Sequence, residues 1–167
     1  MSRCFVLMGV SGCGKTSVGQ ALAADGFVAF FDGDDLHPKE NIAKMTRGEP
    51  LDDADRGPWL AKVGQTLAQH EGPIVVGCSA LKKQYRDIIR AEVKEDVHFL
   101  HLDAPKSVLV DRVANRPGHF MPSSLLDSQF AALEHLMPGE SGTRIDISQS
   151  FEGVMRQSKA YLRDTLG

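Results

Sequence analysis

Residues 4–16 read Cys4-Phe5-Val6-Leu7-Met8-Gly9-Val10-Ser11-Gly12-Cys13-Gly14-Lys15-Thr16, and this stretch decides the fold of the 167-residue chain. Residues 4–8 form a short apolar run, which is typical of a buried parallel strand. Residues 9–16 match the pattern G-x-x-x-x-G-K-[ST], and Val18, Ala21 and Leu22 follow with the spacing of a helix. A strand, a glycine-rich loop and a helix in this order predict a phosphate-binding loop.

The predicted loop has several groups that suit a nucleoside triphosphate. Glycines let the backbone N–H groups point at phosphate oxygens, and the following helix adds its positive N-terminal end. Lys15 is expected to reach the β- and γ-phosphates as a catalytic residue, and the Thr16 hydroxyl is expected to bind Mg²⁺. The alternative is a glycine-rich turn that matches the pattern by chance, which the flanking strand and helix disfavour. The residues expected to contact the nucleotide are Gly9, Val10, Ser11, Gly12, Cys13, Gly14, Lys15, Thr16, Ser17, Arg112 and Arg116.

Strand-like and helix-like segments alternate along the rest of the chain. Apolar runs at 27–31 and 74–76 predict a second and a third strand, residues 97–102 predict a fourth, and residues 144–147 predict a short fifth. Amphipathic stripes between them predict helices, one of which carries Trp59 behind Pro58, a residue suited to a first helical turn. The alternation predicts a three-layer α/β fold, in which helices cover both faces of a parallel sheet. Ligands of such sheets bind beyond the carboxyl ends of the strands.

Acidic residues follow the second predicted strand, at Asp32, Asp34 and Asp35. Alternation along an extended backbone would point Asp32 and Asp34 to the same side. We assign Asp32 to Mg²⁺, and we assign Asp34 to catalysis as the group that binds an acceptor hydroxyl and accepts its proton. The alternative is an acidic loop whose carboxylates only cap the next turn or helix.

Cations suited to a small anionic acceptor occur farther along the chain. The alternative for each is a solvated surface charge, but Arg56 and Lys82 fall at predicted carboxyl-edge positions. Residues 115–124 break a helix and are expected to form a short lid, in which Arg116 and the nearby Arg112 balance charge on the phosphoryl group. Arg116 is therefore expected to be catalytic. The residues expected to contact the acceptor are Asp34, His37, Lys44, Arg47, Arg56, Lys82, Arg86 and His119.

Composition limits the classes of function that remain. The chain is 42% hydrophobic and 25% charged, which is ordinary for one globular domain over residues 1–167. A net charge of −3 argues against stable binding to nucleic acid or to an acidic membrane. No apolar run approaches the ~18 residues that cross a bilayer, and no signal-peptide pattern is present, so we expect a cytoplasmic protein. Its three cysteines have no metal-ligand spacing.

Several blocks of sequence carry a resemblance to a known family. Besides residues 9–16, they are Asp32–Pro38, Asn41–Met45, Gly48–Leu51, Asp55–Arg56 with Pro58–Leu60, Cys78–Lys83 with Tyr85–Arg86, and Gly118–Phe120. In this order they resemble the gluconokinase family of P-loop kinases, over roughly residues 5–154. The blocks that follow the phosphate loop carry the distinction, because that loop alone fits many classes of enzyme.

The resemblance implies ATP-dependent phosphorylation of D-gluconate to 6-phospho-D-gluconate, with ATP and Mg²⁺, by a homodimeric P-loop kinase. It also implies five parallel strands in the order 2-3-1-4-5. It supports the roles given above to Lys15, Thr16, Asp34, Arg56, Arg112 and Arg116. The alternatives are a kinase for another small hydroxy acid such as shikimate, or a nucleotide-gated binding module without phosphoryl transfer. Residues 133–140 depart from the family pattern, in a region expected near the nucleotide base.

Overall fold

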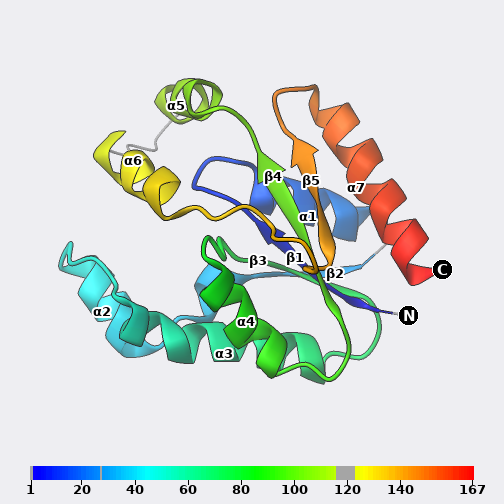
Figure 1. Ribbon diagram of the computed structural model, residues 1–167, viewed down its shortest axis with the longest axis horizontal. Helices are drawn as coiled ribbons and strands as arrows, with labels where there is room; N and C mark the ends of the chain where they lie inside the picture. Colours follow the sequence, from blue (N-terminus) through cyan, green and yellow to red (C-terminus); the bar gives the residue numbers. More distant parts are fainter. Residues whose placement is uncertain (1, 27, 116–122) are drawn as a thin grey trace.

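The computed structural model describes residues 2–26, 28–115 and 123–167, and these contain one parallel sheet of five strands (Figure 1). The strands lie in the order β2-β3-β1-β4-β5. This confirms the predicted fold class and the strand order that the family resemblance implied. The strands are β1 (Cys4–Met8), β2 (Ala29–Asp32), β3 (Ile74–Gly77), β4 (Val97–Asp103) and β5 (Gly142–Asp146).

Helices cover both faces of the sheet and make two separate cores. Phe5 and Leu7 of β1 pack in one core with residues of α1 and α7, whereas Cys4, Val6 and Met8 pack in the other with residues of α3 and α4, as expected when side chains alternate along a strand. No helix in the described part of the chain is long and apolar enough to cross a membrane. The helices are α1 (Lys15–Ala24), the 3-10 helix η1 (Gly33–Leu36), α2 (Lys39–Thr46), α3 (Asp53–Gln69), α4 (Lys83–Ala91), α5 (Lys106–Ala114), α6 (Ser123–Ala132) and α7 (Phe151–Leu166).

Helix α3 begins earlier than the sequence predicted. The Asp52 carboxylate accepts a hydrogen bond from the Asp55 backbone N–H at 2.7 Å, and the Asp55 carboxylate accepts one from the Asp52 N–H at 3.0 Å. This reciprocal capping box starts the helix at Asp53, so Pro58 lies inside the helix rather than in its first turn. Since proline has no N–H, the helix lacks one hydrogen bond there.

Arg86 was predicted to contact the acceptor, and the structure corrects this. Its side chain is fully buried beneath the segment that follows α6. The Nε and Nη2 atoms donate to the Glu140 carboxylate at 2.7 and 3.0 Å, and Nη1 donates to the Ala80 carbonyl at 2.9 Å. Burial alone would raise the pKa of Glu140, but hydrogen bonds from Arg86, the Met137 backbone and Arg90 lower it to about 2. Arg86 therefore holds the segment 135–140 against α4, and its buried guanidinium is not available to an acceptor.

We predict that Glu140→Gln lowers the free energy of unfolding by about 3 to 5 kcal/mol, because it leaves the buried guanidinium without its counter-charge. The matched control is Lys83→Met, which removes the exposed Lys83–Asp87 pair on α4, the helix that also carries Arg86. This control should cost less than about 1 kcal/mol. Urea denaturation of both variants measures the difference. Equal losses in the two variants would contradict the structural role given to the buried pair.

Candidate active site

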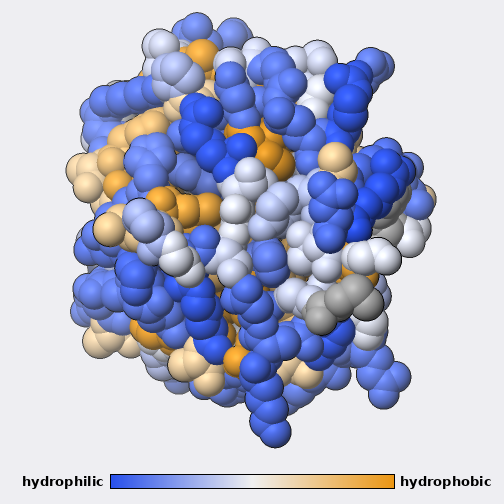
Figure 2. All heavy atoms as spheres, turned by 45° about the vertical axis from the view of Figure 1, so that its right-hand side comes forward, coloured by the Kyte–Doolittle hydropathy of each residue, from blue (hydrophilic) through white to orange (hydrophobic). Residues whose placement is uncertain are grey.

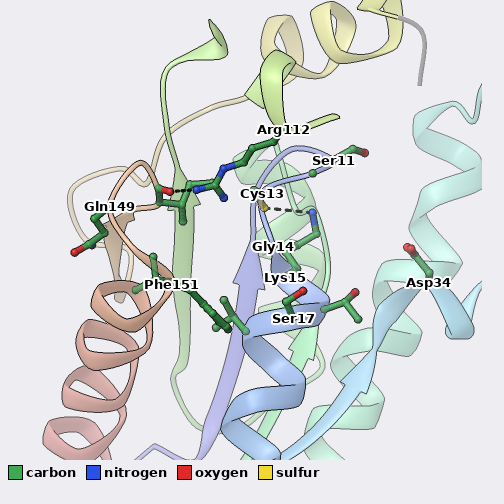
Figure 3. Close-up of a pocket in the computed structure, with 14 residues that line it drawn as sticks. Ser11, Cys13, Gly14, Lys15, Ser17, Asp34, Arg112, Gln149 and Phe151 are labelled. Atoms are coloured by element: carbon green, nitrogen blue, oxygen red, sulfur yellow. Dashed lines mark hydrogen bonds between the residues drawn. The ribbon is translucent and has the colours of Figure 1, made fainter. Parts of the chain in front are cut away.

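A cavity of about 620 Å³ opens beside the loop between β1 and α1, at the carboxyl edge of the sheet (Figure 3). Its size is in the range of small-molecule sites. Four parts of the fold enclose it: the loop with the start of α1, the turn after β2, the end of α5, and the segment from β5 into α7. The lining residues are Ser11, Gly12, Cys13, Gly14, Lys15, Thr16, Ser17, Val18, Asp34, Arg112, Ile147, Gln149, Phe151 and Val154.

The loop has the geometry that phosphate binding requires. Gly12 and Gly14 have φ values of 84° and 99°, a conformation that favours glycine. A side chain at Gly9 has no room, since a Cβ there would lie 2.6 Å from the Leu102 carbonyl oxygen. Helix α1 begins at Lys15 without a side-chain cap, which leaves its first backbone N–H groups available to an anion.

Lys15 lies inside the curve of this loop (Figure 3). Its Nζ donates to the Gly9 carbonyl at 2.8 Å and to the Val10 carbonyl at 3.2 Å, and it lies 3.7 Å from the Cys13 Sγ. Gly9 and Val10 are not among the residues that line the cavity, so their carbonyls hold the lysine from behind. The Cys13 thiol is buried beneath the loop, as expected for a small filler residue.

Thr16 and Asp32 come together as the sequence predicted for a metal site. The Thr16 hydroxyl donates to the Asp32 Oδ2 at 3.5 Å. Hydroxyl and carboxylate oxygens are the hard donors that Mg²⁺ prefers, and Mg²⁺ binds proteins through one or two such groups while it keeps waters and substrate phosphates. The donor set at the start of α1 and the end of β2 therefore fits Mg²⁺.

Asp34 lines the cavity as predicted, but from a 3-10 helix and not from the extended strand on which the prediction relied. Strand β2 ends at Asp32, whose Oδ1 caps η1 by accepting from the Asp34 backbone N–H at 2.9 Å. The alternation argument fails because the chain leaves the extended conformation, yet Asp34 still lines the cavity opposite the phosphate loop (Figure 3). Asp32 thus has the capping role that was the alternative interpretation, and it also lies beside Thr16.

The surroundings of Asp34 make its carboxyl more basic than usual. The side chain is exposed at the cavity, and partial burial by the surrounding protein removes some of its hydration. This burial raises the pKa of Asp34 above its ordinary value of 3.8, repulsion from Asp32 raises it further, and Lys15 opposes both. A carboxylate with a raised pKa is a better proton acceptor, which is the property that a general base needs.

A group of aromatic and charged side chains lies beyond Asp34, on α3, at the start of α4 and in the turn that follows η1. The His37 ring stacks on Trp59 with ring centroids 4.1 Å apart, and partial burial lowers the pKa of His37. Arg56 Nη1 donates to the Tyr85 hydroxyl at 3.3 Å, and Lys82 Nζ lies 5.7 Å from the centre of the Tyr85 ring. These side chains are therefore close enough together to form an acceptor site.

Other predicted acceptor residues have different surroundings. Lys44 Nζ pairs with Asp55 at 2.6 Å and ties α2 to α3, while Arg47 is exposed and pairs with Glu49 at 3.2 Å. Like His37, Arg56 and Lys82, these two residues are not among those that line the cavity. Arg116 and His119, together with most of the expected lid at 115–124, lie outside the described residues.

Sequence analysis missed the wall of the cavity that follows β5. Gln149, Phe151 and Val154 line it, and Arg112 on the opposite side donates through Nη2 to the Ile147 carbonyl (Figure 3). This loop, rather than residues 133–140, therefore faces the predicted nucleotide site. Its sequence contains no motif, so only the packing of α7 beside α1 reveals it.

Known proteins resemble this chain in both sequence and structure. A family model described as an AAA domain matches residues 6–121. The thermosensitive gluconokinase of Escherichia coli K12 is 47% identical over 160 residues, which cover 93% of this chain and 84% of the relative. The gluconokinase of Gluconobacter oxydans is 45% identical over 149 residues, which cover 87% of this chain and 82% of the relative.

Solved structures agree with these sequence relatives. A gluconokinase from Sinorhizobium meliloti superimposes with a TM-score of 0.87 at 45% identity, covering 97% of this chain and 92% of that one. The shikimate kinase of Aquifex aeolicus shares the fold alone, with a TM-score of 0.62 at 15% identity over 98% of each chain. The chain therefore belongs to the gluconokinase family, within the group that the AAA domain model describes.

Proposed function

We propose that this protein transfers the γ-phosphoryl group of ATP to the 6-hydroxyl of D-gluconate, giving 6-phospho-D-gluconate. The observation that carries the proposal is the placement of Asp34 on one cavity with Lys15 and the phosphate loop. Such a cavity has room for a triphosphate tail on one side and a hydroxyl-bearing molecule on the other. The relatives named gluconokinase supply the choice of gluconate.

On the donor side, the phosphate loop and the start of α1 bind the triphosphate. Lys15 offsets negative charge that builds on the phosphoryl group during transfer, and Arg112 faces the same space from α5. Thr16 and Asp32 would hold Mg²⁺, which neutralises charge on the β- and γ-phosphate oxygens when it is bound. Phe151 and Gln149 are placed to contact the base.

On the acceptor side, Asp34 accepts the proton of the attacking hydroxyl as its oxygen bonds to phosphorus. Arg56 and Lys82 carry the positive charge that suits the carboxylate of a sugar acid. His37, with its lowered pKa, presents a neutral imidazole that can hydrogen-bond to a hydroxyl group. Binding both substrates in one cavity makes the transfer effectively unimolecular.

We expect the protein to act in the cytoplasm as a homodimer, as the family resemblance implies. Light scattering coupled to size-exclusion chromatography measures the mass of the particle. A mass of about twice the 18.2 kDa of one chain would support the dimer.

A screen of acceptors tests the proposed function directly. We predict acceptor-dependent release of ADP with D-gluconate, and much less with other aldonates, shikimate or nucleoside monophosphates. A coupled assay for ADP measures each rate, and phosphorus NMR locates the phosphate on the product. ADP release that does not depend on any acceptor would favour a binding module, and transfer to shikimate alone would favour the other kinase.

Asp34→Asn should lower kcat by about 10²- to 10⁴-fold, the usual contribution of a general base, because an amide does not accept the hydroxyl proton. The Kd for ATP should change by no more than a few-fold, since Asp34 lies across the cavity from the phosphate loop. Asp35→Asn is the matched control, because it removes the same charge from the next residue. Undiminished turnover in Asp34→Asn would remove Asp34 as the base.

Arg56→Ala should raise the KM for gluconate by about 10- to 100-fold, the usual effect of losing a hydrogen bond to a charged group. The KM for ATP should stay within a few-fold of its original value. Arg47→Ala serves as the control, since Arg47 is exposed and pairs with Glu49, whereas Arg56 contacts Tyr85 in the group beyond Asp34. Steady-state kinetics with each substrate varied in turn measures both constants. Equal KM values for gluconate in the two variants would refute the contact with Arg56.

A further inference from the structure

Gln129 of helix α6 hydrogen-bonds to the phosphate loop. Its Oε1 accepts a hydrogen bond from the Ser11 backbone N–H at 2.6 Å, and its Nε2 donates to the Ser11 hydroxyl at 2.9 Å. The amide of one residue therefore bonds to both the backbone N–H and the hydroxyl of another residue 118 positions earlier in the chain. Ser11 lines the cavity but Gln129 does not, so Gln129 contacts the loop from outside the nucleotide site.

Helix α6 is itself held in place, both by apolar packing on either side of Gln129 and by hydrogen bonds just after its last residue. Leu126 is buried in the core shared with α1 and α7, and Phe130 packs against the same core. Beyond the helix, the Glu134 N–H donates to the Leu81 carbonyl at 2.7 Å, and the Glu134 carboxylate accepts from the Lys83 N–H at 2.8 Å. Gln129 therefore extends from a supported helix and can hold a flexible loop in one position.

The loop needs such support at its tip, which is formed by Ser11 and Gly12. Residues with positive φ stand on both sides of Cys13, and glycine loses more conformational freedom on ordering than any other residue. Lys15 holds the beginning of the loop through the carbonyls of Gly9 and Val10, but it makes no hydrogen bond to Ser11 among the described residues. Gly12 has no room for a side chain because a Cβ would lie 2.7 Å from Val113 of α5. Gln129 supplies the polar contact at this tip.

We propose that Gln129 is a positioning residue, which holds Ser11 in the conformation that binds nucleotide and thereby couples nucleotide binding to the order of α6. The inference rests on the nucleotide-binding part of the proposed function and not on the identity of the acceptor. Coupling between two sites is reciprocal. A helix that favours the binding conformation of the loop must in turn be stabilised when the loop binds nucleotide.

The test compares Gln129→Ala with Ser128→Ala, whose hydroxyl donates to the Leu125 carbonyl within α6. Titration calorimetry with MgADP, without any acceptor, should show about tenfold weaker binding for Gln129→Ala, in line with the loss of two hydrogen bonds. Ser128→Ala should bind as the unmodified chain does. In hydrogen exchange, MgADP should slow exchange over residues 123–132 of the unmodified chain and of Ser128→Ala. It should have no such effect on α6 in Gln129→Ala.

A merely structural role for Gln129 would lower the melting temperature and leave ADP affinity and the response of α6 to ADP unchanged, which would overturn the inference.

The double variant Ser11→Ala/Gln129→Ala adds a second check. If the two residues act together, it should bind ADP no more weakly than the weaker of the two single variants. If Gln129→Ala does not fold, Gln129→Asn replaces it, because the Asn side chain is one carbon shorter and does not reach Ser11 in the same way. The same ADP affinities and exchange rates then decide the outcome. Failure of the unmodified chain to bind MgADP would overturn both this inference and the proposed function, whereas normal binding without acceptor-dependent turnover would overturn only the latter.

Discussion

The position of Asp34 depends on the close approach of Gly33 to the end of β3. A Cβ at Gly33 would lie 2.3 Å from the Gly77 carbonyl oxygen, so only glycine allows the chain to turn here. The indole N–H of Trp59 donates to the Gly33 carbonyl at 2.8 Å and holds the turn from the side of α3. Because β3 lies between β2 and β1, this turn leaves the carboxylate of Asp34 facing the phosphate loop across the width of one strand.

The two sides of the cavity belong to different parts of the fold. The groups that we propose for the donor line the cavity from the loop between β1 and α1, from α5 and from the segment into α7. Those that we propose for the acceptor are Asp34 on the cavity and, beyond it, side chains on α3 and at the start of α4. Asp53 helps to hold Arg56, since its Oδ1 accepts from the Tyr85 hydroxyl at 2.5 Å and lies 3.6 Å from the Arg56 Nη1. Helix α6 and the segment that follows it connect the two sides, because Gln129 of the helix contacts the phosphate loop and Glu134 beyond it contacts the segment that carries Lys82.

The local features of this fold were predictable from sequence, and the long-range ones were not. The phosphate loop was recognised because its conformation depends on glycines at fixed spacing, and the strands were recognised because they are short apolar runs. Arg86 was misplaced because it lies among other cations on a helix, while its partner Glu140 is 54 residues away with no local signal. The cavity wall at Gln149 and Phe151 was missed for the same reason. Asp34 was assigned to the site on the argument that side chains alternate along a strand, but strand β2 ends at Asp32, two residues before it.

A crystal structure with a non-hydrolysable ATP analogue, Mg²⁺ and D-gluconate tests the central claim most directly. The account predicts that the 6-hydroxyl of gluconate lies between the Asp34 carboxylate, at the ~2.6–3.2 Å of a hydrogen bond, and the terminal phosphate held by the loop. A gluconate that turns a different hydroxyl to the phosphate, or an Asp34 carboxylate that contacts only protein groups or solvent in that complex, would contradict it.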